Sequence, residues 1–141
     1  MVLFLACAIP WTMCLGQPRS DACTCVRPRS AAEEVHAHSA VFVGQVVGVR
    51  GSRYGQRVRL RVAQSWRGAE AGQVFTLWVH DGPCGYTPMR LGEEYLVFAL
   101  PMDGAPEDRV GGIYPPCTFT RRLGDEMPGL GVAGLGPPIS G

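Results

Sequence analysis

Apolar and charged side chains alternate cleanly between residues 57 and 66. The two sets are Val58, Leu60 and Val62 on one side, and Arg57, Arg59 and Arg61 on the other. Successive side chains of a β-strand point to opposite faces of a sheet, so this pattern predicts a strand with one buried and one solvated face. A β-sheet with its core on the Leu60 side is the strongest constraint that the sequence places on the fold.

Other segments of the chain also favour strands. We expect them at Ala40 to Arg50, Gln73 to His80, Glu94 to Leu100 and Gly111 to Thr120. Gly51 to Gly55 would form the hairpin loop between the first two strands, and Gly44 and Gly48 would allow a bend or a close backbone approach. Residues 103–108 should form a surface loop.

A short helix is expected ahead of the first strand. Ser30-Ala31-Ala32-Glu33 fits a capping box, which predicts a helix from Ala31 to His38. Five short strands with one short helix indicate a mainly β fold. A small closed barrel of the five-stranded oligosaccharide/oligonucleotide-binding (OB) type is the natural candidate.

The N-terminus is typical of a cleavable secretion signal. Val2 to Gly16 is an apolar run of signal-peptide length, too short to span a bilayer. Small residues occupy the −3 and −1 positions of a cut after Ala22, and Gly16 offers an earlier site. We therefore expect a signal peptide at residues 1–22, a barrel domain at 23–123 and a loosely ordered, Gly/Pro-rich tail at 124–141, in a secreted or extracytoplasmic protein.

The cysteines of the processed chain suggest disulfides. Cys7 and Cys14 would leave with the signal, so four of the six remain: Cys23, Cys25, Cys84 and Cys117. An even number in an exported chain favours two disulfides. A bond between Cys23 and Cys25 would close a small, strained ring. Each of these two should therefore reach to Cys84 or Cys117.

Several motifs together resemble one known family. Their residues are Cys23-Thr24-Cys25-Val26 with Pro28, Val41-Phe42-Val43-Gly44, Cys84-Gly85-Tyr86, Glu93-Glu94-Tyr95-Leu96 and Cys117-Thr118-Phe119. In order and rough spacing they are similar to the inhibitory domain of tissue inhibitors of metalloproteinases (TIMPs), over about residues 23 to 123. The wider netrin-like module shares this fold. The resemblance implies an OB-fold barrel with the pairings Cys23–Cys84 and Cys25–Cys117.

The resemblance also implies an inhibitory site. In the family the first few residues, with those just before the Cys-Gly-Tyr cysteine, form a wedge that enters a zinc protease. Carried over, the wedge is Cys23, Thr24, Cys25 and Val26 beside Gly82 and Pro83. The α-amine and carbonyl of Cys23 would bind the protease zinc, whose open coordination position accepts such a ligand. Thr24 would enter the S1′ pocket. The family's third disulfide has no counterpart here, because no cysteine lies near His36.

Other chemistries are less well supported by the sequence. His36 and His38 do not share a helix face, so a metal site with Cys23 and Cys25 is disfavoured. The arginine row at residues 57–61 could bind nucleic acid, but a net charge of +1 and export favour a solvated strand face. Asp81, Glu93 and Glu94 form no evident acid–base pair. We expect no enzyme activity, no cofactor and no membrane span.

Two hypotheses for the function follow. The chain is either a secreted metalloprotease inhibitor that acts through Cys23, or a netrin-like, disulfide-stapled module that binds an extracellular protein without inhibiting a protease.

Overall fold

The computed structural model describes residues 28–53, 55–80, 88–101, 110–113 and 118–139. The α-helix α1 (Ala31–Ala37) begins as the capping box predicts. The Ser30 hydroxyl oxygen accepts a hydrogen bond from the Glu33 backbone N–H at 3.3 Å. That bond satisfies one of the helix's otherwise unpaired N-terminal donors. His38 is extended and ends the helix.

Six strands and a short 3₁₀ helix complete the described chain. They are β1 (Ala40–Ser52), β2 (Gly55–Arg67), β3 (Val74–His80), β4 (Glu94–Pro101), β5 (Val110–Ile113), β6 (Arg121–Arg122) and η2 (Val132–Leu135). The protein is mainly β, as predicted.

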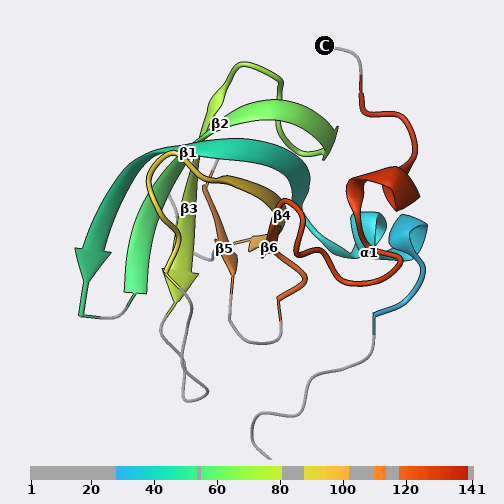
Figure 1. The fold of residues 1–141 in the computed structure, drawn as a ribbon, viewed down its shortest axis with the longest axis horizontal. Coiled ribbons are helices and arrows are strands. Elements are labelled where there is room, and N and C mark those ends of the chain that lie inside the picture. The colour runs from blue at the N-terminus through green and yellow to red at the C-terminus, as the bar shows by residue number, and fades with distance from the viewer. Residues whose placement is uncertain (1–27, 54, 81–87, 102–109, 114–117, 140–141) are drawn as a thin grey trace, which may run out of the picture.

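Five of these strands close into a barrel (Figure 1). The sheet order is β1-β2-β3-β5-β4-β6, and β1 also pairs with β4, which closes the circle. All of the pairings are antiparallel except that of β3 with β5, which is parallel. Closure removes the free sheet edges through which β-proteins aggregate.

The predicted alternation of β2 is confirmed. Val58, Leu60 and Val62 are buried in the barrel interior, and the three arginines between and before them are exposed. The interior also contains Phe42, Phe75, Leu77 and Val97 from the other strands, and Met89 from the segment before β4. The burial of these side chains is the main force that stabilises the barrel.

A second apolar cluster lies outside the barrel wall. Strands β1 and β4 contribute Val41, Val43, Leu96 and Phe98 to it, with Trp66 from β2. Helix α1 and the C-terminal segment cover these side chains, and both lie at one side of the barrel in Figure 1. Because β1 and β4 are buried on both faces here, their sequences are nearly continuous apolar runs rather than alternating ones.

Glycines allow two close backbone approaches. A Cβ built on Gly44 would lie 3.1 Å from Leu60 Cβ and 3.2 Å from the Arg61 carbonyl oxygen. The register of β1 against β2 shifts beside Gly44 and Gly48, which confirms the predicted bend. On β5, a Cβ built on Gly111 would lie only 2.8 Å from Ala99 Cβ. A side chain at Gly111 would therefore push β5 away from β4.

Two expectations differ from the structure. The fifth strand was predicted from Gly111 to Thr120, but β5 ends at Ile113, and residues 118–120 are not a strand. The tail was expected to be loosely ordered. Instead Leu130 is 2% exposed, Trp66 Nε1 donates to the Gly136 carbonyl at 3.0 Å, and the Ile139 N–H donates to the Ser65 carbonyl at 2.7 Å. Apolar side chains of the tail pack against the second cluster. The predicted loop at residues 103–108 lies outside the described residues.

Candidate functional site

The predicted wedge and its cysteines lie outside the described residues. This holds for the segment 23–26, for Gly82, Pro83 and Cys84, and for Cys117. The described strands nevertheless fix the points from which these segments leave the barrel. The surroundings of the predicted wedge can therefore be described from the strand ends that lead to these segments.

Strands β3 and β5 end side by side. They run parallel, and Val79 near the end of β3 is paired with Ile113, the last residue of β5. Cys84 follows the end of β3 by 84 − 80 = 4 residues, and Cys117 follows the end of β5 by 117 − 113 = 4 residues. Neighbouring strands lie about 4.8 Å apart. The two downstream cysteines therefore belong to segments that start from adjacent points at one end of the barrel.

The start of the described chain is held by a buried carboxylate. Glu34 on α1 is 2% exposed, and its Oε1 accepts a hydrogen bond from the Arg29 N–H at 2.9 Å. The Arg29 side chain lies 3.6 Å from the same oxygen, and His38 Nδ1 lies 3.8 Å from Oε2. The His38 ring packs edge-on against Phe98 and Phe119. These contacts hold the chain at Arg29, just ahead of the helix.

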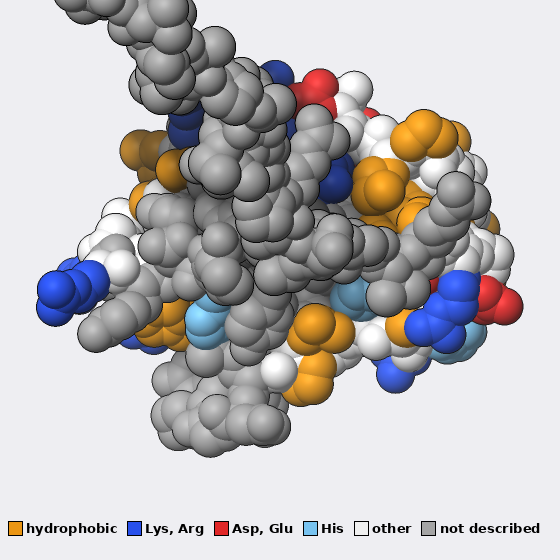
Figure 2. All heavy atoms as spheres, turned by 90° about the horizontal axis from the view of Figure 1, so that it is seen from below, with side chains coloured by type: hydrophobic (Ala, Val, Ile, Leu, Met, Phe, Trp, Pro, Cys, Tyr) orange, Lys and Arg blue, Asp and Glu red, His pale blue; other side chains and the backbone are white. Residues whose placement is uncertain are grey.

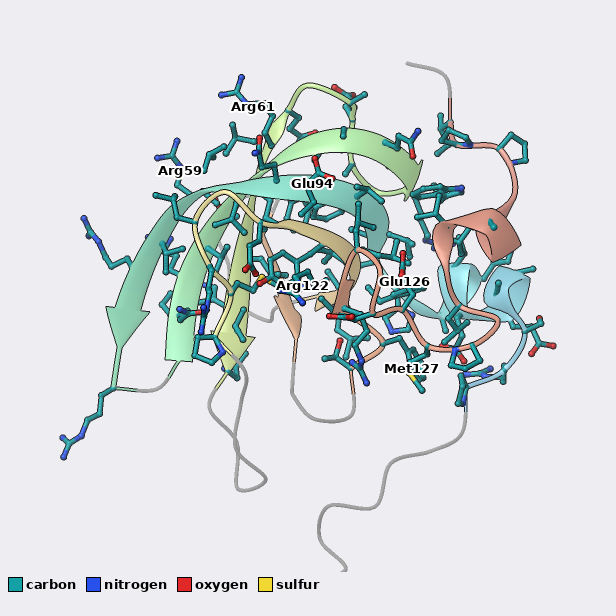
Figure 3. All side chains as sticks on the ribbon, in the orientation of Figure 1. Arg59, Arg61, Glu94, Arg122, Glu126 and Met127 are labelled. Carbon is teal, nitrogen blue, oxygen red and sulfur yellow. The ribbon has the colours of Figure 1, made fainter. Side chains whose placement is uncertain are left out.

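A second candidate site is the outer face of the β1–β2 hairpin. Arg57, Arg59 and Arg61 are exposed there, and Arg50 of β1 is paired directly with Arg57. Figure 3 shows Arg59 and Arg61 pointing outward, away from the barrel interior. We call Arg50, Arg57, Arg59 and Arg61 the arginine face. Its Arg50 member was missed from the sequence, because only the cross-strand register places it beside β2.

The arginine face encloses a small open groove. It has a volume of about 320 Å³ and is lined by Gly48, Val49, Arg50, Arg57 and Arg59. A Cβ built on Gly48 would lie 3.7 Å from Arg59 Cδ, so the Arg59 side chain extends over the glycine. The groove exists because Gly48 has no side chain beneath the arginines.

A polar cluster joins β4 to β6. The Tyr95 hydroxyl donates to Glu93 Oε2 at 2.7 Å and accepts from the Arg90 N–H at 3.3 Å. Burial, together with the bond to Glu93, raises the pKa of Tyr95 above its ordinary value of 10.0. The Arg122 guanidinium lies 3.6 Å from Glu93 and 3.1 Å from Asp125. Asp125, and to a lesser extent Glu93, raises the pKa of Arg122 above its ordinary value. These contacts hold the short strand β6 on the barrel.

The other predicted groups do not form a common site. His36 Nδ1 lies 3.3 Å from Arg67 Nη1, whereas His38 packs between aromatic rings, so the two histidines have separate surroundings. Within the described part of the chain, no group of three or more histidine, cysteine or acidic residues could hold a metal ion. Trp66 is buried in the second cluster, and Trp78 lies half-exposed on β3. Asp81 lies outside the described residues.

Comparison with protein-family models and with curated proteins finds no match to this chain. None of the described helices is long and apolar enough to cross a membrane.

Proposed function

We propose that the chain is a secreted inhibitor of the TIMP kind, built on an OB-fold barrel, which binds a zinc metalloprotease through the amine and carbonyl of Cys23. The observation that carries the proposal is the parallel pairing of β3 with β5 at one end of the closed barrel. A Cys-x-Cys pair needs two partner cysteines close to each other, and the segments that lead to Cys84 and Cys117 start from these two adjacent strands.

The distances support this arrangement. Residues two apart in an extended chain lie about 7 Å apart, and disulfide-bonded Cα atoms about 4.4–6.8 Å apart. Cys84 and Cys117 should therefore lie within about 20 Å of each other if Cys23 and Cys25 reach both. Their segments start from adjacent strands, and four residues span at most about 14 Å. The pairings Cys23–Cys84 and Cys25–Cys117 would fasten the first residues of the processed chain to this end of the barrel.

The overall architecture supports the fold that the resemblance implies. A five-stranded barrel closed between β1 and β4 agrees with an OB-type barrel. The chain entering α1 is held at Arg29 by the buried Glu34, and Cys25, the last residue of the Cys-x-Cys motif, precedes Arg29 by 29 − 25 = 4 residues. An N-terminal ligand for zinc must be presented rigidly, because binding that also has to order a mobile segment is weakened by the lost entropy.

The chemistry needs only the processed N-terminus. A free α-amine has a pKa of about 7.7–8.0, so part of it is neutral near pH 7, and zinc binding displaces the proton from the rest. Together with the carbonyl oxygen of Cys23 it would replace the catalytic water of the protease. Thr24 would enter the S1′ pocket, with Val26, Gly82 and Pro83 forming the rest of the contact.

The test compares two forms of the secreted protein. N-terminal sequencing and disulfide mapping first identify material that begins at Cys23 and carries the pairings Cys23–Cys84 and Cys25–Cys117. One alanine is then added before Cys23, which removes the chelating terminus and leaves the barrel unchanged. Inhibition of zinc metalloproteases should fall by orders of magnitude, while the melting temperature stays the same.

Three results would contradict the proposal. The first is a protein that begins at Gln17, and the second is a Cys84–Cys117 bond. The third is a correctly processed protein that inhibits no member of a broad zinc-protease panel, or inhibits equally well with the extra alanine.

A further inference from the structure

The arginine face concentrates positive charge on a nearly neutral protein. The whole chain carries a net charge of +1, yet Arg50, Arg57, Arg59 and Arg61 share one outer surface of two adjacent strands. Arg50 and Arg57 are direct cross-strand partners. Like charges in that position destabilise a sheet. Fold stability therefore offers no reason for this arrangement.

Few carboxylates are available to balance these charges. Among the described residues, none of the four arginines has an ion pair, whereas Arg29 and Arg122 do. The β3 neighbours of Arg57, Arg59 and Arg61 are the uncharged Trp78, Thr76 and Val74. On the other side Glu94 lies across Gln45 from Arg61 and marks the end of the positive surface. In the view from below, Figure 2 shows basic side chains beside acidic ones at the right of the molecule.

The geometry of the arginines specifies the shape of a ligand. Alternate residues of a strand lie about 6.8 Å apart on one face, so Arg57, Arg59 and Arg61 form a row with about that spacing. An extended peptide with acidic residues at every second position carries carboxylates with the same spacing on one side. Arginine guanidinium groups bind carboxylates through two parallel hydrogen bonds. Spacing and chemistry therefore match along the whole row.

We propose that the arginine face binds an extended acidic segment of a partner protein, with carboxylates on alternate residues, lying along β2 and across the groove beside Gly48. The half-exposed Thr76 and Trp78 of β3, which are cross-strand partners of Arg59 and Arg57, supply uncharged surface beside the row for the residues between the acidic ones. The proposal concerns described residues of β1 and β2 and its test measures peptide binding, so the test does not depend on inhibitory activity.

The surroundings favour a peptide over a single-stranded nucleic acid. Nucleic-acid grooves of this kind stack successive bases on several aromatic side chains. Among the described outward-facing residues beside the row, Trp78 is the only aromatic side chain, and Thr76 and Val74 continue its strand. One ring could hold one base but not a succession of them.

The experiment uses two capped peptides with equal charge. One contains four Glu-Thr repeats, and the other contains four Glu-Thr-Thr repeats, which in an extended chain place successive carboxylates on opposite sides. Binding to the full protein is measured by fluorescence anisotropy at low salt. The Glu-Thr peptide should bind at least about fivefold more tightly, and its affinity should fall as salt is raised. Equal binding of the two peptides would overturn the proposal.

Charge reversal locates the site. Arg57→Glu and Arg59→Glu should each weaken binding of the Glu-Thr peptide by at least about fivefold. Arg67→Glu is the matched control, since Arg67 is exposed at the far end of β2, beside His36, and its variant should bind within about twofold of the unchanged protein. Melting curves establish that the variants are folded. Equal losses for Arg59→Glu and Arg67→Glu, or tighter binding of a twelve-residue oligothymidine or of dextran sulfate than of the Glu-Thr peptide, would refute the acidic-peptide site.

Discussion

Tyr95 combines a buried ring with a hydroxyl group that is fully bonded. It is 8% exposed, its ring packs in the barrel core, and its hydroxyl lies between Glu93 and the Arg90 N–H. Burial, the larger cause, and the bond to Glu93 both disfavour the tyrosinate, so the pKa of Tyr95 in the folded chain lies above that in the unfolded chain. The protonated hydroxyl therefore stabilises the fold.

This residue should make the protein sensitive to alkaline pH. A pKa that folding raises gives stability that is complete below the unfolded value of about 10 and is lost as pH rises through the folded value. Tyr95→Phe should cost about 0.5–1.5 kcal/mol at pH 7, from the lost hydrogen bonds, and the difference from the unchanged protein should shrink above pH 10. Denaturant unfolding of both proteins from pH 8 to pH 11.5 measures it. A difference that stays constant across that range would mean that Tyr95 ionises as readily folded as unfolded.

At the scale of the element, β2 separates core from surface along one strand. Leu60→Ala should lower the free energy of unfolding by about 2–5 kcal/mol, because Leu60 is fully buried in the barrel interior. Arg59→Ala, one residue away and exposed, should change it by less than about 0.5 kcal/mol. Urea denaturation of the two variants checks the pair. Similar small losses would show that β2 is not packed as described.

Whether an element could be predicted from the sequence depended on what surrounds it in the fold. One face of β2 is exposed to solvent, so apolar and charged residues alternate along its sequence. The Ser30 cap depends only on residues three positions apart. β1 and β4 are buried on both faces in part, which hides their register. The close packing of Gly111 depends on contact with Ala99 of β4, so the pairing of β5 could not be predicted from its own residues. The pairing of Arg50 with Arg57 and the buried role of Glu34 likewise require the assembled fold.

At the scale of the whole molecule, the C-terminal segment is part of the structure. Leu130 is buried, Val132 and Leu135 pack against the cluster around Trp66, and η2 contacts α1. Both ends of the described chain thus meet on one side of the barrel (Figure 1). The glycine- and proline-rich composition of the C-terminal segment indicated disorder. A few of its apolar side chains are nevertheless enough to pack it against the second apolar cluster.

Leu130→Ala should therefore lower the free energy of unfolding by about 2–5 kcal/mol. Ile139→Ala is the control within the same segment, because Ile139 is 58% exposed, and its loss should be below about 1 kcal/mol. Thermal melts of the two variants measure the effect. If the two variants melt together, the tail does not contribute to stability and could be removed.

Closure of the barrel also determines the order in which the chain can fold. One edge of β1 pairs with β2 through a short hairpin. The other edge of β1 stays unpaired until β4 is present, since Ala40 pairs with Ala99. During synthesis the apolar run Val41-Phe42-Val43 therefore has an open edge until β4 leaves the ribosome. Contacts so distant in sequence form slowly, and an unpaired apolar strand can meanwhile pair with another chain. Strand β1, whose pairing with β4 closes the native barrel, is thus exposed to aggregation until the barrel exists.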